Sequence, residues 1–309
     1  MAHLPAKAKS KLLIGGILSA AILGWPVTAA ETATHPDFTG PWGRNAMDPE
    51  LLPSGPRPLV NTLRPYDDPH QSGGGDPIPL VGDYNNPILK PEAAEAVKQA
   101  GELSAGGRIN PDPSNNCGAY APPYGFTIQL GVEILQNKDE ILFMYPQDDQ
   151  VRHVRLNGGH PRKVKPTPMG DSVAHWEGDT LVVDTIGVEV GPVSMVDRYG
   201  TPLSPSMHLV ERYRLIDVAE ARAAMEQHER RAGRVGGRGG AMPFDPKDTK
   251  ALQLEYRVED PNVFTMPWSA RVTYRRTTLP WAEQICAENI VEYWPGFNKG
   301  VPTADKPDF

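Results

Sequence analysis

The second half of the chain consists of short segments that alternate apolar with polar residues, as β-strands do. From Gly125 onward these segments are rich in aromatic and β-branched residues, and most of them are bounded by Gly, Pro, Asp or Asn. The predicted strands are residues 126–137, 140–146, 150–158, 171–177, 180–187, 206–216, 252–260, 268–278 and 283–294. The fold class is therefore all-β. Roughly eight to ten strands joined by short turns favour an antiparallel up-and-down barrel, with an open sandwich as the alternative.

Two regions depart from the strand pattern. Residues 31–124 are rich in Pro and Gly, so we expect a long irregular N-terminal arm on the surface that contains a first strand at "DFTGPW" and one short helix over Lys90–Leu103. The barrel domain would then span residues 125–309. It is interrupted by a helical insertion at Asp217–Asp248, which ends in "GRVGGRGG". The arginines of that insertion could bind an anion, but a solvated helix and loop is the plainer interpretation.

The first thirty residues indicate a signal peptide. Lys7, Lys9 and Lys11 precede the apolar run "LLIGGILSAAILGW", and small residues follow as a cleavage site near Ala30. The apolar run is shorter than the ~20 residues of a membrane span. We therefore expect a periplasmic or secreted protein with no stable membrane insertion after cleavage.

The net charge bears on the possible binding partners, and the cysteine content bears on a possible disulfide. A net charge of −7 gives no electrostatic basis for binding nucleic acid. The chain has 2 cysteines, Cys117 and Cys286, and in an oxidising compartment such a pair is expected to form a disulfide. Two buried free thiols are the alternative.

Several runs together resemble a widespread family of exported bacterial proteins that has no assigned reaction. They are "DFTGPW", "RLNGGHP", "MGDSVAHWEGDTLVVDT", "LVERYR", "EDPNVFTMPW" and "CAENI", and "WEGDTLVVDT" is the most specific. The resemblance covers most of Phe126–Asn289, and relatives run from the "ERYR" strand directly to the next one, where this chain has its insertion. Gly40 and Trp42 also resemble the "G-x-W" motif of calycins, which implies a lipocalin-like barrel with Trp42 packed at its closed end.

The run "WEGDTLVVDT" places an acid in an apolar strand row. With Gly178 and Asp179 as a two-residue turn, Val173 pairs with Asp184 and His175 shares its face. A carboxylate diagonal to an imidazole is an arrangement that proton transfer requires. It is also what a structural hydrogen bond looks like, so Asp184 is either a catalyst or a structural support.

The strand "MHLVERYRL" carries ionisable groups on both of its faces. If Leu209, Glu211 and Tyr213 point inward, Glu211 is a buried carboxylate that needs an arginine partner. If the other row points inward, His208 and Arg212 line a cavity. The sequence leaves both directions open, and we take Asp184, His175, His208 and Glu211 as candidate catalytic residues.

Candidate substrate-binding residues are less specific. They are Arg212, His153, Tyr256 and Trp268, and for the two aromatic residues core packing is the alternative role. The histidines at 153, 160, 175 and 208 lack the tight spacing of a metal-binding motif, so we expect no metal and no cofactor.

These residues favour a cofactor-free enzyme that uses acid and base chemistry, of hydratase, dehydratase, isomerase or lyase type, on a small apolar or aromatic molecule. A periplasmic lipocalin-like carrier of a hydrophobic ligand is the first alternative, and an envelope interaction protein that uses the N-terminal arm is the second. Facing carboxylate and imidazole groups would favour the enzyme, whereas a dry pocket would favour the carrier. The oligomeric state stays open.

Overall fold

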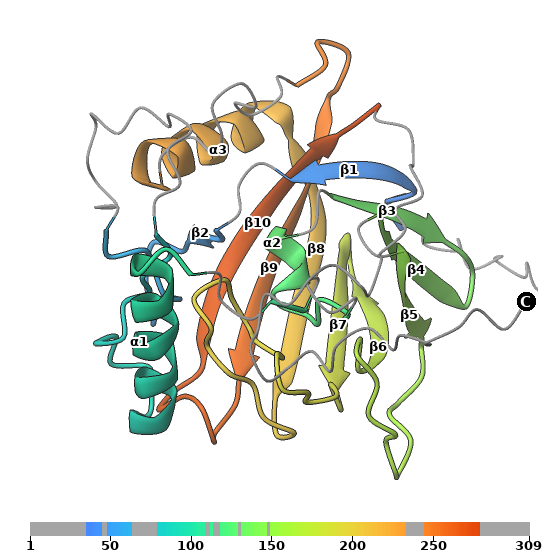
Figure 1. Ribbon diagram of the computed structural model, residues 1–309. Coiled ribbons are helices and arrows are strands. Elements are labelled where there is room, and N and C mark those ends of the chain that lie inside the picture. The colour runs from blue at the N-terminus through green and yellow to red at the C-terminus, as the bar shows by residue number, and fades with distance from the viewer. Residues whose placement is uncertain are drawn as a thin grey trace, which may run out of the picture. The chain divides into compact units, whose positions relative to one another are not determined.

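A computed structural model describes residues 35–44, 48–63, 79–108, 112–113, 118–128, 131–146, 149–232 and 244–278. All of them belong to one compact unit, residues 35–309. Its strands are β1 Gly40–Arg44, β2 Glu50–Leu51, β3 Gly131–Gln136, β4 Glu140–Tyr145, β5 Gln150–Leu156, β6 Asp171–Glu177, β7 Thr180–Ile186, β8 His208–Asp217, β9 Lys250–Glu259 and β10 Trp268–Arg276, and its helices are α1 Pro91–Ala105, α2 Gly125–Ile128 and α3 Val218–Ala232 (Figure 1). The expected signal peptide, the expected last strand and both cysteines lie outside the described residues.

The strands close into a nine-strand barrel because β1 pairs with both β3 and β10. All neighbours around the ring run antiparallel except β5 and β6, which pair in parallel through Val154 and Ser172. The purely antiparallel topology that the sequence favoured is therefore wrong at this one pair. Strand direction must return to itself around a closed ring, so an odd number of strands cannot close with antiparallel pairs alone. The connection over residues 157–170 makes the parallel step possible.

The β6–β7 hairpin has the register that the sequence predicted. Val173 pairs with Asp184, His175 with Val182, and Glu177 with Thr180. Gly178, the first turn residue, has a φ of 61°, a conformation that glycine adopts without strain. The two-residue turn therefore fixes which residues of β7 share a face.

The start of β3 differs from the prediction. Phe126 was expected to begin a strand, but it lies in the short helix α2, and β3 begins only at Gly131. Tyr124, Phe126 and Thr127 are all buried. A strand sends consecutive side chains to opposite faces, whereas a helical turn can direct these neighbouring residues into the same core.

Aromatic side chains from the strands and from α2 pack together inside the barrel. The ring centroids of Phe143 and Tyr213 are 5.1 Å apart. The ring centroid of Tyr256 is 5.4 Å from that of Phe126 and 5.9 Å from that of Trp268. These contacts are of the tilted and edge-to-face kind that packed aromatic cores use. The interior is thus a packed core around these rings.

Trp42 is buried, as the sequence predicted, with 1 % of its surface exposed. It lies on β1 where the first and last barrel strands meet, its Nε1 donates to the carbonyl of Phe38 at 2.8 Å, and the Arg276 guanidinium lies 3.8 Å from its ring centroid. Trp42 therefore helps to join the two ends of the sheet.

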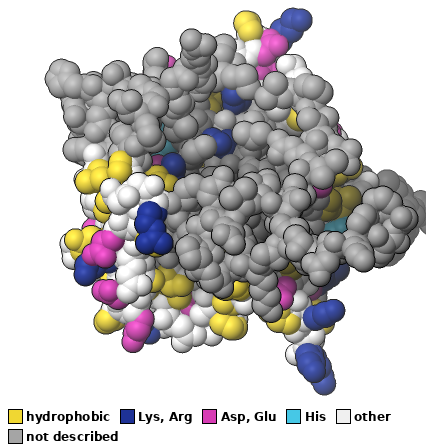
Figure 2. Space-filling model, viewed as in Figure 1, with side chains coloured by type: hydrophobic (Ala, Val, Ile, Leu, Met, Phe, Trp, Pro, Cys, Tyr) yellow, Lys and Arg dark blue, Asp and Glu magenta, His cyan; other side chains and the backbone are white. Residues whose placement is uncertain are grey.

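The N-terminal arm contributes more to the core than its composition suggested. Leu59, Ile88 and Val97 belong to the same buried cluster as the barrel interior. Val97 lies on α1, whose outer side carries ion pairs of Lys98 with Glu95 and Glu102. In Figure 2 charged side chains of both signs are interspersed with apolar ones over this part of the molecule.

Candidate functional site

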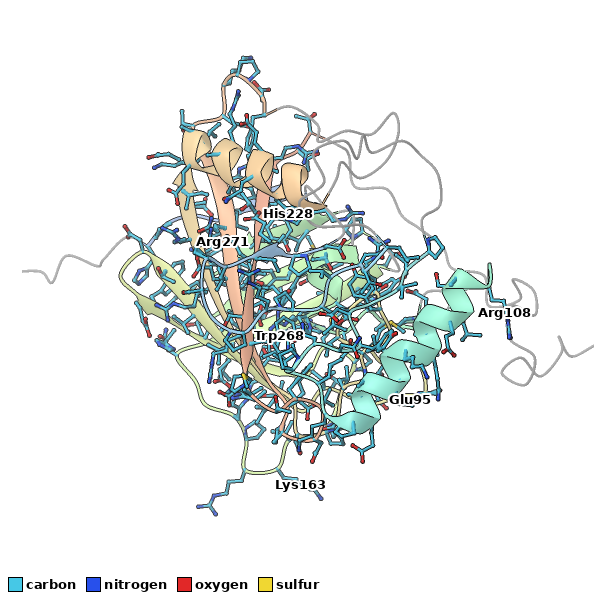
Figure 3. All side chains as sticks on the ribbon, turned by 90° about the vertical axis from the view of Figure 1, so that its left-hand side faces the viewer. Glu95, Arg108, Lys163, His228, Trp268 and Arg271 are labelled. Atoms are coloured by element: carbon cyan, nitrogen blue, oxygen red, sulfur yellow. The ribbon has the colours of Figure 1, made fainter. Side chains whose placement is uncertain are left out.

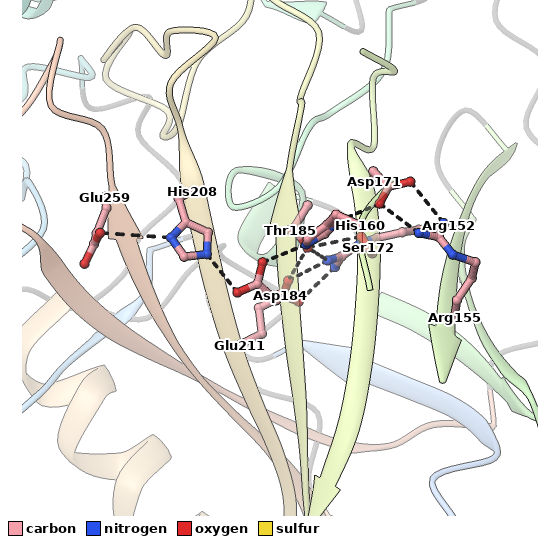
Figure 4. A network of polar contacts seen from close by, with 10 residues as sticks. All are labelled: Arg152, Arg155, His160, Asp171, Ser172, Asp184, Thr185, His208, Glu211 and Glu259. Atoms are coloured by element: carbon pink, nitrogen blue, oxygen red, sulfur yellow. Dashed lines mark hydrogen bonds and ion pairs between the residues drawn. The ribbon is translucent and has the colours of Figure 1, made fainter. Parts of the chain in front are cut away.

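Two polar networks lie on opposite faces of the strands β5 to β8 (Figure 4). The inner network is centred on Arg152 of β5 and Glu211 of β8, which are 1 % and 0 % exposed. Arg152 Nη1 donates to Glu211 Oε2 at 2.8 Å and Nη2 donates to Oε1 at 2.5 Å. This bidentate geometry is the strongest form of a carboxylate–guanidinium pair.

Neighbouring hydroxyl groups complete the inner network. Arg152 also donates to Ser172 at 3.0 Å and Thr185 at 2.6 Å, and Tyr213 donates to Glu211 at 2.7 Å. Burial alone would lower the pKa of Arg152, but the charge of Glu211, the hydrogen bonds to it and the nearby tyrosines together outweigh burial and raise that pKa. Both charges are thus held by the fold, and Glu211 is engaged as an ion-pair partner rather than open to a substrate.

The outer network is a chain of alternating acids and bases. Asp184 of β7 contacts two imidazoles, with Oδ1 2.9 Å from His160 Nε2 and Oδ2 2.8 Å from His208 Nε2. His160 Nδ1 lies 2.6 Å from Asp171, which also accepts two bonds from Arg155. Asp184 and His208, two of the candidate catalytic residues, are therefore in contact, on the outside of the barrel.

The two imidazoles of the outer network differ in their partners. Both ring nitrogens of His160 lie within hydrogen-bond distance of carboxylate oxygens, Nδ1 of Asp171 and Nε2 of Asp184. His208 uses Nε2 toward Asp184, and its Nδ1 is 4.0 Å from Glu259. At that distance the two groups are within ion-pair range, but the contact is too long for a hydrogen bond.

The acids of the outer chain are held in their charged form. Burial by itself would raise the pKa of Asp184, but the hydrogen bonds and charge interactions with His208 and His160 together outweigh burial and lower that pKa. The Arg155 hydrogen bonds are the main cause that lowers the pKa of Asp171. The side chains of Asp184 and His208 are 39 % and 36 % exposed, so the end of this chain meets solvent.

Three predicted residues lie apart from both networks. His175 is exposed and contacts Glu177 at 3.2 Å, and Arg212 donates to the same Glu177 at 2.6 Å. His153 is exposed and contacts Glu140 at 2.7 Å. Although His175 shares a face with Asp184, the structure brings His208 and His160 to that acid instead.

The predicted aromatic residues Tyr256 and Trp268 line a small space inside the barrel end. Its volume is about 10 Å³, which is room for one water molecule. Trp268 Nε1 has no hydrogen-bond partner among the described residues. Both rings also pack in the core, so the structure gives them a packing role beside this water-sized site.

An acid that the sequence analysis missed lies beside these rings. Asp197 accepts hydrogen bonds from the amide of Tyr199 and the hydroxyl of Thr201, and burial raises its pKa to about 6. The sequence signal for Asp197 was its position two residues before Tyr199. An aspartate side chain commonly closes a turn by accepting a hydrogen bond from the backbone amide two residues further on. Its bonds to the turn give it a structural role.

His160 was considered only as one of four possible metal ligands. It lies in the connection between β5 and β6, where no strand alternation indicates the direction of its side chain. Among the described residues, no group of three or more His, Cys, Asp or Glu has a geometry that could hold a metal ion. Nor does any helix in the described ranges have the length and hydropathy that a membrane-spanning segment needs.

Comparisons with family models, with curated proteins and with solved structures give no match for this chain.

Proposed function

We propose that the protein is an enzyme that performs acid and base chemistry on a small apolar or aromatic molecule, with His208 as the group that moves the proton. The single observation that carries this proposal is the 2.8 Å contact between His208 Nε2 and Asp184 Oδ2. A carboxylate on one ring nitrogen fixes the tautomer and orientation of an imidazole and stabilises its protonated form. The other nitrogen, Nδ1, then accepts or returns a proton.

The chain behind Asp184 supports this role. His160 binds the second oxygen of Asp184 and is itself bound to Asp171, so the carboxylate has little freedom to rotate. A positioned acid or base contributes typically 10²–10⁴-fold to a reaction rate, and that contribution depends on such fixed geometry. His160 and Asp171 are thus positioning residues in this proposal.

The surroundings of Asp184 support an apolar or aromatic substrate. Its neighbours across the sheet are Val173 on β6 and Val210 on β8, and Val182 and Ile186 flank it in its own row. Val173 and Val182 are buried and Val210 and Ile186 are partly exposed, so the surroundings of the Asp184–His208 contact are apolar. In a hydration, His208 Nδ1 would take a proton from water while the water oxygen bonds to one carbon of a double bond, and Nδ1 would then return that proton to the adjacent carbon.

The lipocalin-like carrier is the second function that the sequence favoured. A carrier of this kind holds its ligand inside the barrel, and there the rings of Phe143, Tyr213 and Tyr256 contact their neighbours. The packed interior thus supports the carrier less than the outer dyad supports the enzyme. We retain periplasmic export and the disulfide between Cys117 and Cys286 as proposals from the sequence.

A labelling screen tests the enzyme proposal. Purified protein is incubated with a bacterial metabolite extract in water that contains ¹⁸O, and separately in D₂O, and label incorporation is followed by mass spectrometry. A hydratase introduces ¹⁸O, a dehydratase does so through its reverse reaction, and an isomerase or a lyase acting through a carbanion introduces deuterium. Label that appears with the wild type and is lost with His208→Gln supports the proposal.

The matched control is Asp179→Asn, which removes a carboxylate from the exposed turn of the hairpin that carries Asp184. It should label as the wild type does. If no metabolite is labelled, or if His208→Gln labels as fast as the wild type, the proposal is wrong.

A further inference from the structure

A second pocket lies outside the barrel, between helix α3 and the strands β2 and β10. Its volume is about 200 Å³. Drug-sized ligands occupy pockets of roughly 300–1,000 Å³, so this one fits a molecule of about one ring. The residues that line it are Glu50, Leu51, Pro53, Ala224, Gln227, His228 and Arg271. It shares no residue with either polar network of the candidate site.

Helix α3, which forms one wall of this pocket, is held in place by buried contacts. Ala221 and Met225 of α3 pack with Ile216, Phe244 and Ala251 in a buried cluster of their own. The pocket face of the helix carries Ala224, Gln227 and His228, which lie three and four residues apart and therefore share one side. The pocket is thus formed by an anchored helix.

The strand wall supplies the charged groups. Glu50 of β2 lies directly across from Arg271 of β10. Arg271 donates through both Nε and Nη2 to Glu255 Oε1, at 3.1 and 2.6 Å, so its charge is already balanced on the sheet. Burial is the main cause that raises the pKa of Glu50. Figure 3 shows His228 on α3 and Arg271 on β10 at this side of the molecule.

The charge balance selects the chemical class of ligand. The pocket is lined by one acidic and one basic side chain, Glu50 and Arg271, so a carboxylate and an ammonium group would each meet one like charge. A neutral molecule rich in hydroxyl groups meets neither repulsion, because each hydroxyl both donates and accepts. The carboxyl, amide and guanidinium groups of Glu50, Gln227 and Arg271 around one space offer the donors and acceptors that such a molecule requires.

We propose that the pocket between α3, β2 and β10 binds a neutral polyhydroxy compound the size of one sugar ring, either free or at the end of a longer glycan. The site is independent of the proposed enzyme activity.

Binding is tested by saturation-transfer NMR and calorimetry with D-glucose, D-galactose, myo-inositol and maltotriose, each up to about 10 mM, a concentration that detects Kd values in the millimolar range. Acetate and methylammonium serve as charged probes of similar or smaller size. We expect at least one polyhydroxy probe to bind and both charged probes to fail. Binding of a monosaccharide or inositol indicates a free ligand, and binding of maltotriose alone indicates a glycan end.

Ala224→Phe fills the pocket from the helix side and should weaken this binding about tenfold or more. Ala223→Phe makes the same change at an exposed neighbour that does not line the pocket, and it should bind as the wild type does. Circular dichroism establishes that both variants fold, and Gln227→Ala, at an exposed lining residue, provides a second weakening variant. Failure of all four polyhydroxy probes, preferential binding of a charged probe, or equal effects of the two phenylalanine variants would overturn the proposal.

Discussion

The inner and outer networks use the same kinds of side chain on the same strands and differ in solvent access. In the inner network, Arg152 and Glu211 satisfy one another in a core from which water is excluded. In the outer network, Asp184 and His208 are more than one-third exposed, and His208 Nδ1 lies 4.0 Å from Glu259, beyond hydrogen-bond distance. Removing one partner of a buried ion pair leaves an uncompensated charge in the core, which destabilises the fold. An exposed pair of a carboxylate and an imidazole can instead gain or lose a proton.

Residues that are consecutive along a strand belong to different networks. Asp184 and Thr185 are neighbours on β7, and Asp171 and Ser172 are neighbours on β6, yet the first of each pair belongs to the outer chain and the second to the inner network. Alternation along a strand is sufficient to produce this division. Chemical role is thus decided here by the direction of the side chain as much as by residue type.

The largest expected effect comes from breaking the inner pair. Glu211→Gln leaves the buried Arg152 guanidinium without its counter-charge, so the free energy of unfolding should fall by ~3–5 kcal/mol. The double variant Arg152→Met, Glu211→Leu should recover most of that loss, because two apolar side chains leave no buried charge. Urea unfolding curves measure both values.

The control for the inner pair is Glu177→Gln, which removes a carboxylate that accepts from Arg212 on the outer face. Exposed ion pairs contribute little, so its unfolding curve should nearly coincide with that of the wild type. An equal loss for Glu177→Gln and Glu211→Gln would show that burial does not distinguish the two networks.

The next effect is expected on activity rather than stability. Asp184→Asn should lower turnover of the substrate found by labelling by ~100-fold or more, because His208 loses the charge that stabilises its protonated form. The same change should reduce the free energy of unfolding by ~1 kcal/mol or less, since the carboxylate is partly screened by solvent. Turnover and urea unfolding are measured on the same preparation. A large loss of stability with unchanged turnover would make Asp184 a structural support.

The local fold was accessible from the sequence because it depends on short-range rules. The two-residue turn at Gly178 and Asp179 determined the hairpin register, and the Pro at the first turn identified α1, Pro91–Ala105. The parallel pair β5–β6 was missed because it depends on how residues 157–170 cross the barrel end. A loop of that kind has no periodicity from which its path could be read.

The candidate site was only partly predictable for the same reason. Alternation placed His208 and Arg212 on one face of β8 and Glu211 on the other, but both rows mix apolar with charged residues. The two arginines of the His208 row, Arg212 and Arg214, were the signal that this row faces solvent. His160 reaches Asp184 from 24 residues away along the chain, and neither strand period nor motif indicates such a contact.

The pH dependence of stability provides a smaller test of the outer chain. The pKa values of Asp171 and Asp184 are lowered in the folded protein, below the value of about 3.9 for a free aspartate. Their contribution is therefore present above about pH 4 and is lost as the pH falls through the folded pKa values. Urea midpoints measured from about pH 5 downward should fall less steeply for the double variant Asp171→Asn, Asp184→Asn than for the wild type. Parallel curves for the two proteins would contradict this.

The smallest expected effect concerns the connection that carries His160. This side chain links residues 157–170 to Asp171 and Asp184, and His160→Ala removes both contacts. Amide hydrogen exchange in that connection should become faster by a few-fold, because local opening no longer breaks two charge-assisted bonds. Turnover should fall less than with Asp184→Asn, since the carboxylate that holds His208 remains. The control is Lys163→Ala in the same connection, where Figure 3 shows the side chain directed away from the barrel, and its exchange should match the wild type. If His160→Ala leaves exchange unchanged while turnover falls as far as with Asp184→Asn, His160 takes part in the proton transfer itself, and the division of the outer chain into a reacting end and a positioning end is wrong.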